Sequence, residues 1–170
     1  MSERQPLEST QKDKTVVAGS IPPLDEHGLL PQGTHDCTLE DIVEKFCWNE
    51  HRKKLFNGLC GFLENEWKPR GIRCPVYIDG SFTRSKNLPN DIDVVIDMSD
   101  FDSGKAAVVA FKIHLNHDRI KETYSTDAWV YHPSFPWDIV AFFQYTGDKA
   151  AAELCIADKK RPKGILRIRL

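Results

Sequence analysis

Apolar residues recur at helical spacing in three stretches of the chain. The segment 38–46 opens with a capping box, in which a threonine is followed three residues later by an aspartate, and it predicts a short helix. The segment 50–67 has one apolar stripe with charges opposite, and Pro69 limits the helix that it predicts. The segment 104–115 predicts a third helix, although two bulky apolar residues interrupt its stripe.

Runs rich in Val, Ile and aromatic residues predict the strands of a sheet. The predicted strands are 74–79, 91–98, 128–132, 137–145 and 164–170. We expect 128–132 and 137–145 to pair in an antiparallel turn around Pro133 and Pro136. The apolar faces of the helices are expected to pack on this sheet, so the pattern indicates an α/β domain.

The N-terminal segment of the chain differs from the rest in its low content of apolar residues. Residues 1–20 are polar and mixed in charge, with a single apolar cluster, and predict a disordered tail. Prolines favour an extended lead-in over 21–31. A length of 170 residues leaves room for one domain, which we place at 21–170.

The strand predicted over 91–98 has an apolar face and an acidic face. With a period of two, Ile92, Val94, Ile96 and Met98 point one way, whereas Asp91, Asp93, Val95 and Asp97 point the other. Neighbouring carboxylates repel one another, so such a row favours a bound cation, and Mg²⁺ is a hard ion that carboxylates hold. The alternative is a solvated strand edge.

A turn that could approach a phosphate precedes this strand. Gly80 and Ser81 end the strand 74–79, and a glycine followed by a small hydroxyl residue lets the backbone come close to an anion. Arg84 and Lys86 follow in the same loop, with no acidic residue before Asp91. Gly-Ser alone is a common turn dipeptide, and it is its pairing with the acidic strand that favours phosphate binding.

Together these motifs resemble a known superfamily. Gly80-Ser81, nine further residues and then Asp91-Ile92-Asp93 reproduce the G-S-x(9)-D-x-D signature of the DNA polymerase beta-like nucleotidyltransferases. Flanking segments, Gly28-Leu29-Leu30-Pro31 and Pro162-Lys163-Gly164-Ile165, resemble a small bacterial family of uncharacterised function. The likeness covers roughly 28–170. It implies a minimal nucleotidyltransferase fold of the α/β class, a mixed twisted sheet with helices packed mainly on one face.

The resemblance also implies a two-metal site. In the superfamily, Mg²⁺ or Mn²⁺ ions held by paired carboxylates, here Asp91 and Asp93, bridge to the triphosphate of a nucleotide, and a third carboxylate polarises the attacking hydroxyl. Asp138 is our candidate for the third, because it is a lone charge within an apolar predicted strand, and Asp127 is the alternative. The expected nucleotide-binding residues are Gly80, Ser81, Arg84, Lys86 and Asn90, and an Asx turn is the alternative role of the last.

The implied activity is transfer of a nucleoside monophosphate from an NTP or dNTP to a hydroxyl of a protein, an RNA or a growing oligonucleotide. Small superfamily members often belong to toxin–antitoxin or anti-phage modules, so the resemblance implies a role in bacterial defence and a cognate partner protein. The alternative is a catalytically silent regulator, in which the fold survives as an antitoxin-like binding partner.

Charge and cysteine content limit other classes of function. Lys and Arg number 23 against 25 Asp and Glu, a net charge of −2, which argues against a protein held to nucleic acid by bulk charge. Six basic residues lie in the last twelve, as a surface either for a phosphate backbone or for solubility alone. Five cysteines without CxxC spacing and no apolar leader favour the cytoplasm, and no apolar run is long enough for insertion into a membrane.

His114 and His117 are spaced as a pair of metal ligands could be, but no carboxylate or cysteine spacing supports a metal site there. We assign both histidines to a solvated helix face.

Overall fold

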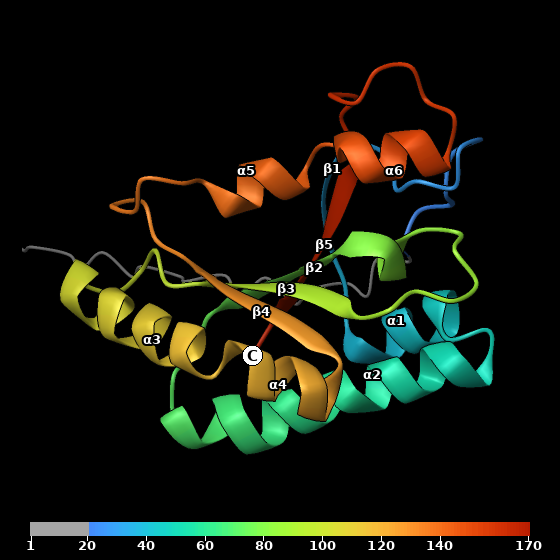
Figure 1. The fold of residues 1–170 in the computed structure, drawn as a ribbon. Helices are drawn as coiled ribbons and strands as arrows, with labels where there is room; N and C mark the ends of the chain where they lie inside the picture. Colours follow the sequence, from blue (N-terminus) through green and yellow to red (C-terminus); the bar gives the residue numbers. More distant parts are fainter. Residues whose placement is uncertain (1–20) are drawn as a thin grey trace, which may run out of the picture.

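A five-stranded mixed sheet forms the centre of the computed structural model, which describes residues 21–170 (Figure 1). The tail predicted over 1–20 lies outside the described residues. The strands, in sheet order, are β1 (Gly33–Asp36), β5 (Gly164–Arg169), β2 (Pro75–Asp79), β3 (Ile92–Asp97) and β4 (Thr126–Tyr131). The outer pairs β1–β5 and β3–β4 are parallel and the inner pairs are antiparallel. The predicted α/β class is confirmed.

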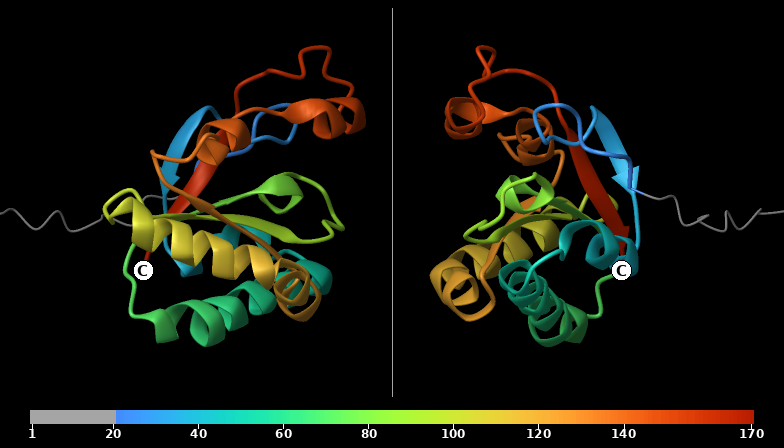
Figure 2. Two further views of the ribbon diagram at one scale, coloured as in Figure 1. Left: turned by 60° about the vertical axis from the view of Figure 1, so that its left-hand side comes forward. Right: turned by 90° about the vertical axis from the view of Figure 1, so that its right-hand side faces the viewer.

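Four helices cover one face of this sheet, below it in Figure 1 and again in both views of Figure 2. They are α1 (Leu39–Phe46), α2 (Glu50–Phe62), α3 (Ser103–Leu115) and α4 (His117–Tyr124). The predicted alternation along β3 is confirmed, because Ile92, Val94, Ile96 and Met98 all lie in the core between the sheet and these helices. The apolar face of β3 therefore points away from its aspartates.

The helix boundaries follow the predicted local signals. In α1 the capping box is present, with the Asp41 amide donating to Thr38 Oγ1 at 3.2 Å and the Thr38 amide donating to Asp41 Oδ2 at 2.8 Å. The helix predicted over 50–67 is confirmed as α2 and a wider turn of the π type over Leu63–Trp67. A 3₁₀ turn over Lys68–Arg70 follows, and Gly71 ends that turn with φ +64°, a left-handed conformation that glycine adopts without a Cβ clash.

Two further helices, α5 (Ile139–Phe143) and α6 (Gly147–Glu153), lie on the opposite side of the sheet (Figure 1). Ile139, Val140 and Phe143 of α5 pack on a smaller cluster formed by Tyr77, Val95 and Ile165. The strand predicted over 137–145 is therefore wrong, and so is its antiparallel pairing with the strand before it. Instead, β4 pairs in parallel with β3, and α3 and α4 make the crossover between them.

The other predicted strands and the helix over 104–115 are confirmed, whereas β1, α4 and α6 were not predicted. Each of these three is a short element, so its periodicity spans too few residues to stand out from neighbouring loops. All five cysteines are free thiols. None of the helices within residues 21–170 is long and apolar enough to cross a membrane.

Candidate active site

A cavity of about 610 Å³ opens at the end of the sheet where β2 ends and β3 and β4 begin. We call it the carboxylate cavity. Its opposite wall is the segment that contains α5 and α6. The residues from the sequence analysis that line it are Gly80, Ser81, Arg84, Lys86, Asn90, Asp91, Asp93 and Asp127.

Strand pairing places three aspartates side by side across the sheet. Asp93 on β3 is in register with Asp79 on β2 and with Asp127 on β4. Asp91 precedes β3 by one residue and lines the same cavity. Like charges directly opposite one another on neighbouring strands are destabilising, so this row needs compensating cations.

The third carboxylate of the cavity is Asp127 and not Asp138. Asp138 is exposed, does not line the carboxylate cavity, and serves as the N-cap of α5, where it accepts a hydrogen bond of 2.8 Å from the Ala141 amide. The choice of Asp138 rested on a strand over 137–145, and in a helix the same aspartate is satisfied by the free amides of the first turn. The structure thus brings together Asp91, Asp93 and the alternative candidate Asp127.

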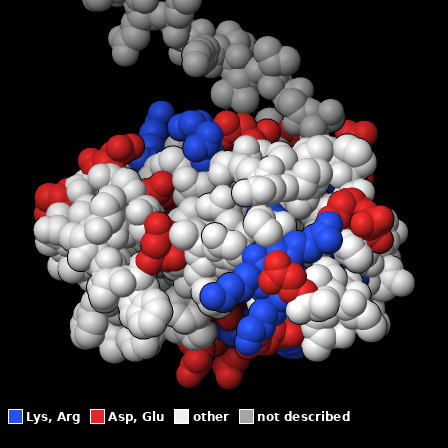
Figure 3. Space-filling view, turned by 90° about the horizontal axis from the view of Figure 1, so that it is seen from above, with Lys and Arg blue, Asp and Glu red and all other residues white. Residues whose placement is uncertain are grey.

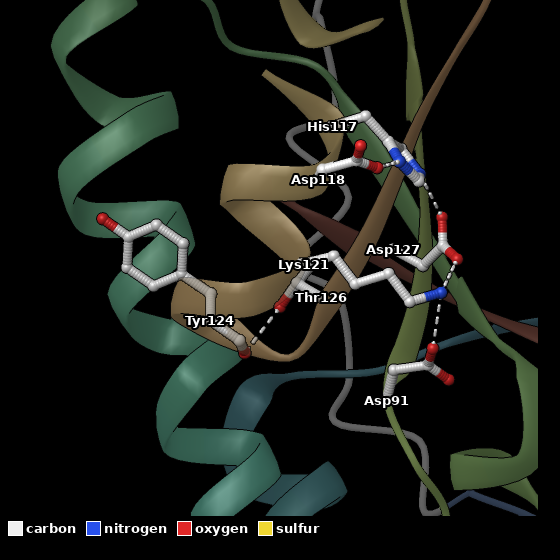
Figure 4. Close-up of polar contacts among 7 residues, drawn as sticks. All are labelled: Asp91, His117, Asp118, Lys121, Tyr124, Thr126 and Asp127. Atoms are coloured by element: carbon white, nitrogen blue, oxygen red, sulfur yellow. Dashed lines mark hydrogen bonds and ion pairs between the residues drawn. The ribbon is translucent and has the colours of Figure 1, made fainter.

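A lysine from α4 neutralises part of this charge (Figure 4). Lys121 Nζ lies 2.8 Å from Asp91 Oδ2 and also donates to Asp127 Oδ2. His117 Nε2 contacts Asp127 Oδ1 at 2.8 Å, so the prediction that His117 lies on a solvated helix face is wrong. Burial acts to raise the pKa of Asp127, but the hydrogen bonds from Lys121 and His117 outweigh it and lower that pKa. Asp127 is therefore ionised at neutral pH.

Asp93 differs from the other carboxylates of the cavity in having no partner. It has no hydrogen bond or ion pair with any residue of 21–170, whereas Asp91 and Asp127 contact Lys121 and Asp79 contacts Lys163. Burial and the charges of the three neighbouring aspartates raise the pKa of Asp93 to about 7. An oxygen ligand is thus held in the cavity without a compensating cation of its own.

The turn after β2 is built around a buried ion pair. Asp79 contacts Lys163 Nζ, and both side chains are almost fully buried. Thr83 Oγ1 donates to Asp79 Oδ1 at 3.2 Å, which closes the single 3₁₀ turn Gly80–Thr83 over this pair. Gly80 has φ +83°, and a Cβ at that position would overlap the Asp93 carboxylate. Glycine is therefore required both by the backbone conformation and by the close approach of Asp93.

The two basic residues of the loop contact α6. Arg84 Nη2 lies 2.8 Å from Glu153 Oε2, and Lys86 Nζ lies 3.0 Å from Glu153 Oε1. These hydrogen bonds lower the pKa of Glu153. Because Arg84 and Lys86 also line the carboxylate cavity, an anion in the cavity would compete with Glu153 for them.

A buried arginine in α2 holds this loop from below. Arg52 donates to the carbonyl oxygens of Phe46 and Phe82 and, at 2.5 Å, to that of Lys86. Burial lowers its pKa to about 10, so the guanidinium stays charged at neutral pH. The helical pattern of 50–67 does not reveal this role, since two of the three carbonyls, those of Phe82 and Lys86, lie 30 and 34 residues away in the sequence.

The donor set fits a hard divalent cation in its chemistry, although not in the arrangement that the side chains now have. Within residues 21–170, no three His, Cys, Asp or Glu side chains are grouped as ligands of one ion. The Lys121 ammonium lies between Asp91 and Asp127 instead. Unpartnered Asp93 and the two aspartates beside it nevertheless offer the carboxylate oxygens that Mg²⁺ or Mn²⁺ prefers, once Lys121 withdraws.

Comparisons with known proteins give a family without an activity. No curated protein and no solved structure matches the chain. A family model matches residues 22–169, which covers nearly all of the described chain. The chain therefore belongs to DUF6932, a family of unknown function.

Proposed function

We propose that the carboxylate cavity is the site of a metal-dependent nucleotidyl transfer, from an NTP or dNTP to a hydroxyl acceptor. The observation that carries this proposal is Asp93, a carboxylate without a partner that lines the cavity with Asp91 and stands in register with Asp79 and Asp127. An isolated, partly buried charge among like charges is unfavourable unless a cation joins it. The G-S-x(9)-D-x-D resemblance supports the same function.

Each group of residues has a defined part in this proposal. Asp91, Asp93 and Asp127 would hold Mg²⁺ or Mn²⁺, which when bound supplies positive charge for the oxygens that enter and leave at phosphorus. The Gly80–Ser81 turn, which lines the cavity, would approach a phosphate with its backbone, and Arg84 and Lys86 would release Glu153 to bind that phosphate. Asp127 would accept the proton of the acceptor hydroxyl after Lys121 has moved away.

The wider biological role rests on the resemblance alone. A place in a bacterial toxin–antitoxin or anti-phage module, with a cognate partner protein, is the hypothesis that this likeness supports. Two features of the cavity bear on the acceptor, namely its exposed aromatic rim and the lysines beside it.

A second candidate is the catalytically silent regulator. It is favoured by one observation, that the charges of the cavity are largely balanced without a ligand. Lys121 pairs with Asp91 and Asp127, and Glu153 pairs with Arg84 and Lys86. A protein that had lost its substrates could keep such internal pairs as structural contacts.

A transfer assay on two matched variants separates these candidates. Purified protein is incubated with each labelled nucleoside triphosphate, Mg²⁺ and RNA, DNA or protein acceptors, and labelled products are resolved on gels. Asp127→Asn should lose transfer by about 10²–10⁴-fold, since general-base help is worth that much. Asp138→Asn should transfer as the wild type does, because Asp138 only caps α5.

Two results of this assay would contradict the proposal. If the wild type binds triphosphate but labels no acceptor, the regulator becomes the better hypothesis. If Asp138→Asn loses transfer and Asp127→Asn keeps it, the third carboxylate has been placed wrongly.

The affinity for metal should rise when Lys121 is replaced by methionine. This change keeps the length of the side chain and removes the cation between Asp91 and Asp127, whose repulsion of a divalent ion is on the order of 1–2 kcal/mol at a solvated site, or about tenfold in affinity. Mn²⁺ binding is measured by electron paramagnetic resonance of the free ion.

Lys149→Met is the control, since Lys149 lines the same cavity from α6 without an ion pair to the described residues. It should change Mn²⁺ affinity far less. Weaker Mn²⁺ binding by Lys121→Met than by the wild type would show that Lys121 supports the metal instead of competing with it.

A further inference from the structure

We propose that a groove beside the carboxylate cavity binds a single-stranded nucleic acid, whose terminal hydroxyl is the acceptor. The inference rests on the proposed function and names its acceptor. The groove is a second cavity, of about 560 Å³, and we call it the aromatic groove. It is lined by Phe142, Tyr145, Gly147, Asp148, Lys159 and Lys160.

The aromatic groove adjoins the carboxylate cavity. Phe142, Tyr145, Gly147 and Asp148 line both of them. A chain that lies in the groove can therefore place its end in the cavity that Asp91, Asp93 and Asp127 share. A free nucleotide needs only one of these two spaces, whereas a polymer with a reactive end needs both.

Two aromatic rings at the shared rim are left in solvent. Phe142 is 66% exposed and Tyr145 is 49% exposed, although their neighbours Ile139, Val140 and Phe143 pack on the sheet. Leaving large apolar side chains in water is unfavourable, unless a ligand covers them. Exposed rings next to a phosphate-handling cavity are suited to stacking of bases, which is tolerant of sequence because every base has a π-face.

Lysines form the other side of the groove. Lys160 has no ion pair with residues of 21–170, and Lys159 pairs only with exposed Asp148, at 3.1 Å. Such an exposed pair contributes little and can be exchanged for a phosphate. Viewed from the side of α5 and α6, Lys and Arg side chains gather around a few acidic ones (Figure 3). Lys159 and Lys160, which line the groove, make part of the basic C-terminal segment a surface suited to a phosphate backbone.

The aromatic and basic sides are fixed relative to each other by main-chain hydrogen bonds. The Thr146 amide donates to the Arg161 carbonyl at 3.0 Å, and the Gly147 amide donates to the Lys159 carbonyl at 2.9 Å. Tyr145 forms an isolated β-bridge with Pro162. The groove is therefore preformed, which lowers the entropic cost of binding a flexible strand.

The charge pattern favours nucleic acid over a protein acceptor. Aromatic rings on one side of the groove and ammonium groups on the other match bases and phosphates, while an apolar protein segment would leave the lysines without partners. A different exposed apolar set lies on α3, where Val108, Phe111 and Leu115 face solvent. It lies on the helix layer across the sheet from α5, so it provides a control surface.

The test is fluorescence anisotropy with a short labelled oligoribonucleotide and its DNA counterpart, without metal or triphosphate. Phe142→Ala should weaken binding by about tenfold or more, the scale of losing one stacked base. Lys160→Glu should weaken binding too and should flatten its dependence on salt. Both side chains are exposed, so the melting temperature should be unchanged. The controls on α3, Phe111→Ala and Lys112→Glu, should bind as the wild type does.

Each outcome decides the matter. The groove is excluded if the wild type does not bind either oligonucleotide, or if the α3 variants lose as much affinity as Phe142→Ala and Lys160→Glu. Oligonucleotide binding without any transfer would leave the groove in place and overturn the proposed function. Transfer to a protein hydroxyl by a chain that binds no oligonucleotide would support the proposed function and overturn the groove as a nucleic-acid site.

Discussion

Replacing Asp93 with asparagine should greatly slow transfer and at the same time make the metal-free protein more stable. Transfer should fall by about a thousandfold, the scale on which lost electrostatic stabilisation of a transition state acts. Stability should rise because the variant lacks an unpaired carboxylate that is repelled by Asp91, Asp79 and Asp127. A substitution that damages only the fold would lower both quantities, so the opposite signs identify a charge kept for binding.

The gain in stability should depend on pH in a specific direction. The pKa of Asp93 is raised to about 7 in the folded state by burial and neighbouring carboxylates. The folded wild type therefore holds its proton more tightly than the unfolded chain, and its stability falls as the pH rises from about 4 to about 7. The difference between Asp93→Asn and the wild type should be absent below about pH 4 and reach about 1–3 kcal/mol above pH 7. Urea denaturation at several pH values measures it.

Asp97→Asn is the matched control for this prediction. Asp97 lies on the same face of β3 but accepts hydrogen bonds from the Ser99 amide and from Tyr77 Oη, and it does not line the carboxylate cavity. Its replacement should lower stability slightly and leave transfer intact. Equal effects of the two substitutions on transfer would contradict the site.

Arg52→Met should give the largest loss of stability, about 3 kcal/mol or more, because buried acceptors that lose a donor cost about 1–3 kcal/mol each. The carbonyl oxygens of Phe46, Phe82 and Lys86 would all lose the guanidinium. The contacts of Arg52 with the faces of Trp48 and Phe82, at 3.7 and 4.6 Å from the ring centroids, would be lost as well. Chemical denaturation measures the change.

Two comparisons sharpen this second prediction. Arg52→Lys keeps the charge but not the fork of donors, so it should lose an intermediate amount. Lys53→Met, on the adjacent and exposed position of α2, should have little effect. A loss no larger in Arg52→Met than in Lys53→Met would mean that the loop 82–86 is held by other contacts.

Short-range patterns predicted most of the fold. The capping box of α1 and the alternation along β3 depend only on neighbouring residues, and both were correct. The failure over 137–145 has a local cause as well. The apolar run after Asp138 is compatible with a strand or with one helical turn, and the aspartate that seemed to be a charge buried in a strand is the N-cap of that turn.

The site was predictable only where its residues are close in sequence. Gly80, Ser81, Asp91 and Asp93 were recognised as a unit, and they do line one cavity. The position of Asp127 depends on the parallel register of β3 with β4, which the sequence does not display. Lys163 and Glu153 lie 84 and 69 residues from their partners Asp79 and Arg84, so no local pattern could reveal those pairs.

The order of the strands bears on how the chain folds during synthesis. β5 is translated after the other four strands, yet it lies between β1 and β2 in the sheet. Until it emerges from the ribosome, β1 has no neighbour and β2 presents an open hydrogen-bonding edge, which is a hazard for aggregation. The sheet, its buried Asp79–Lys163 pair and the whole cavity are thus completed in a single late event of the nascent chain.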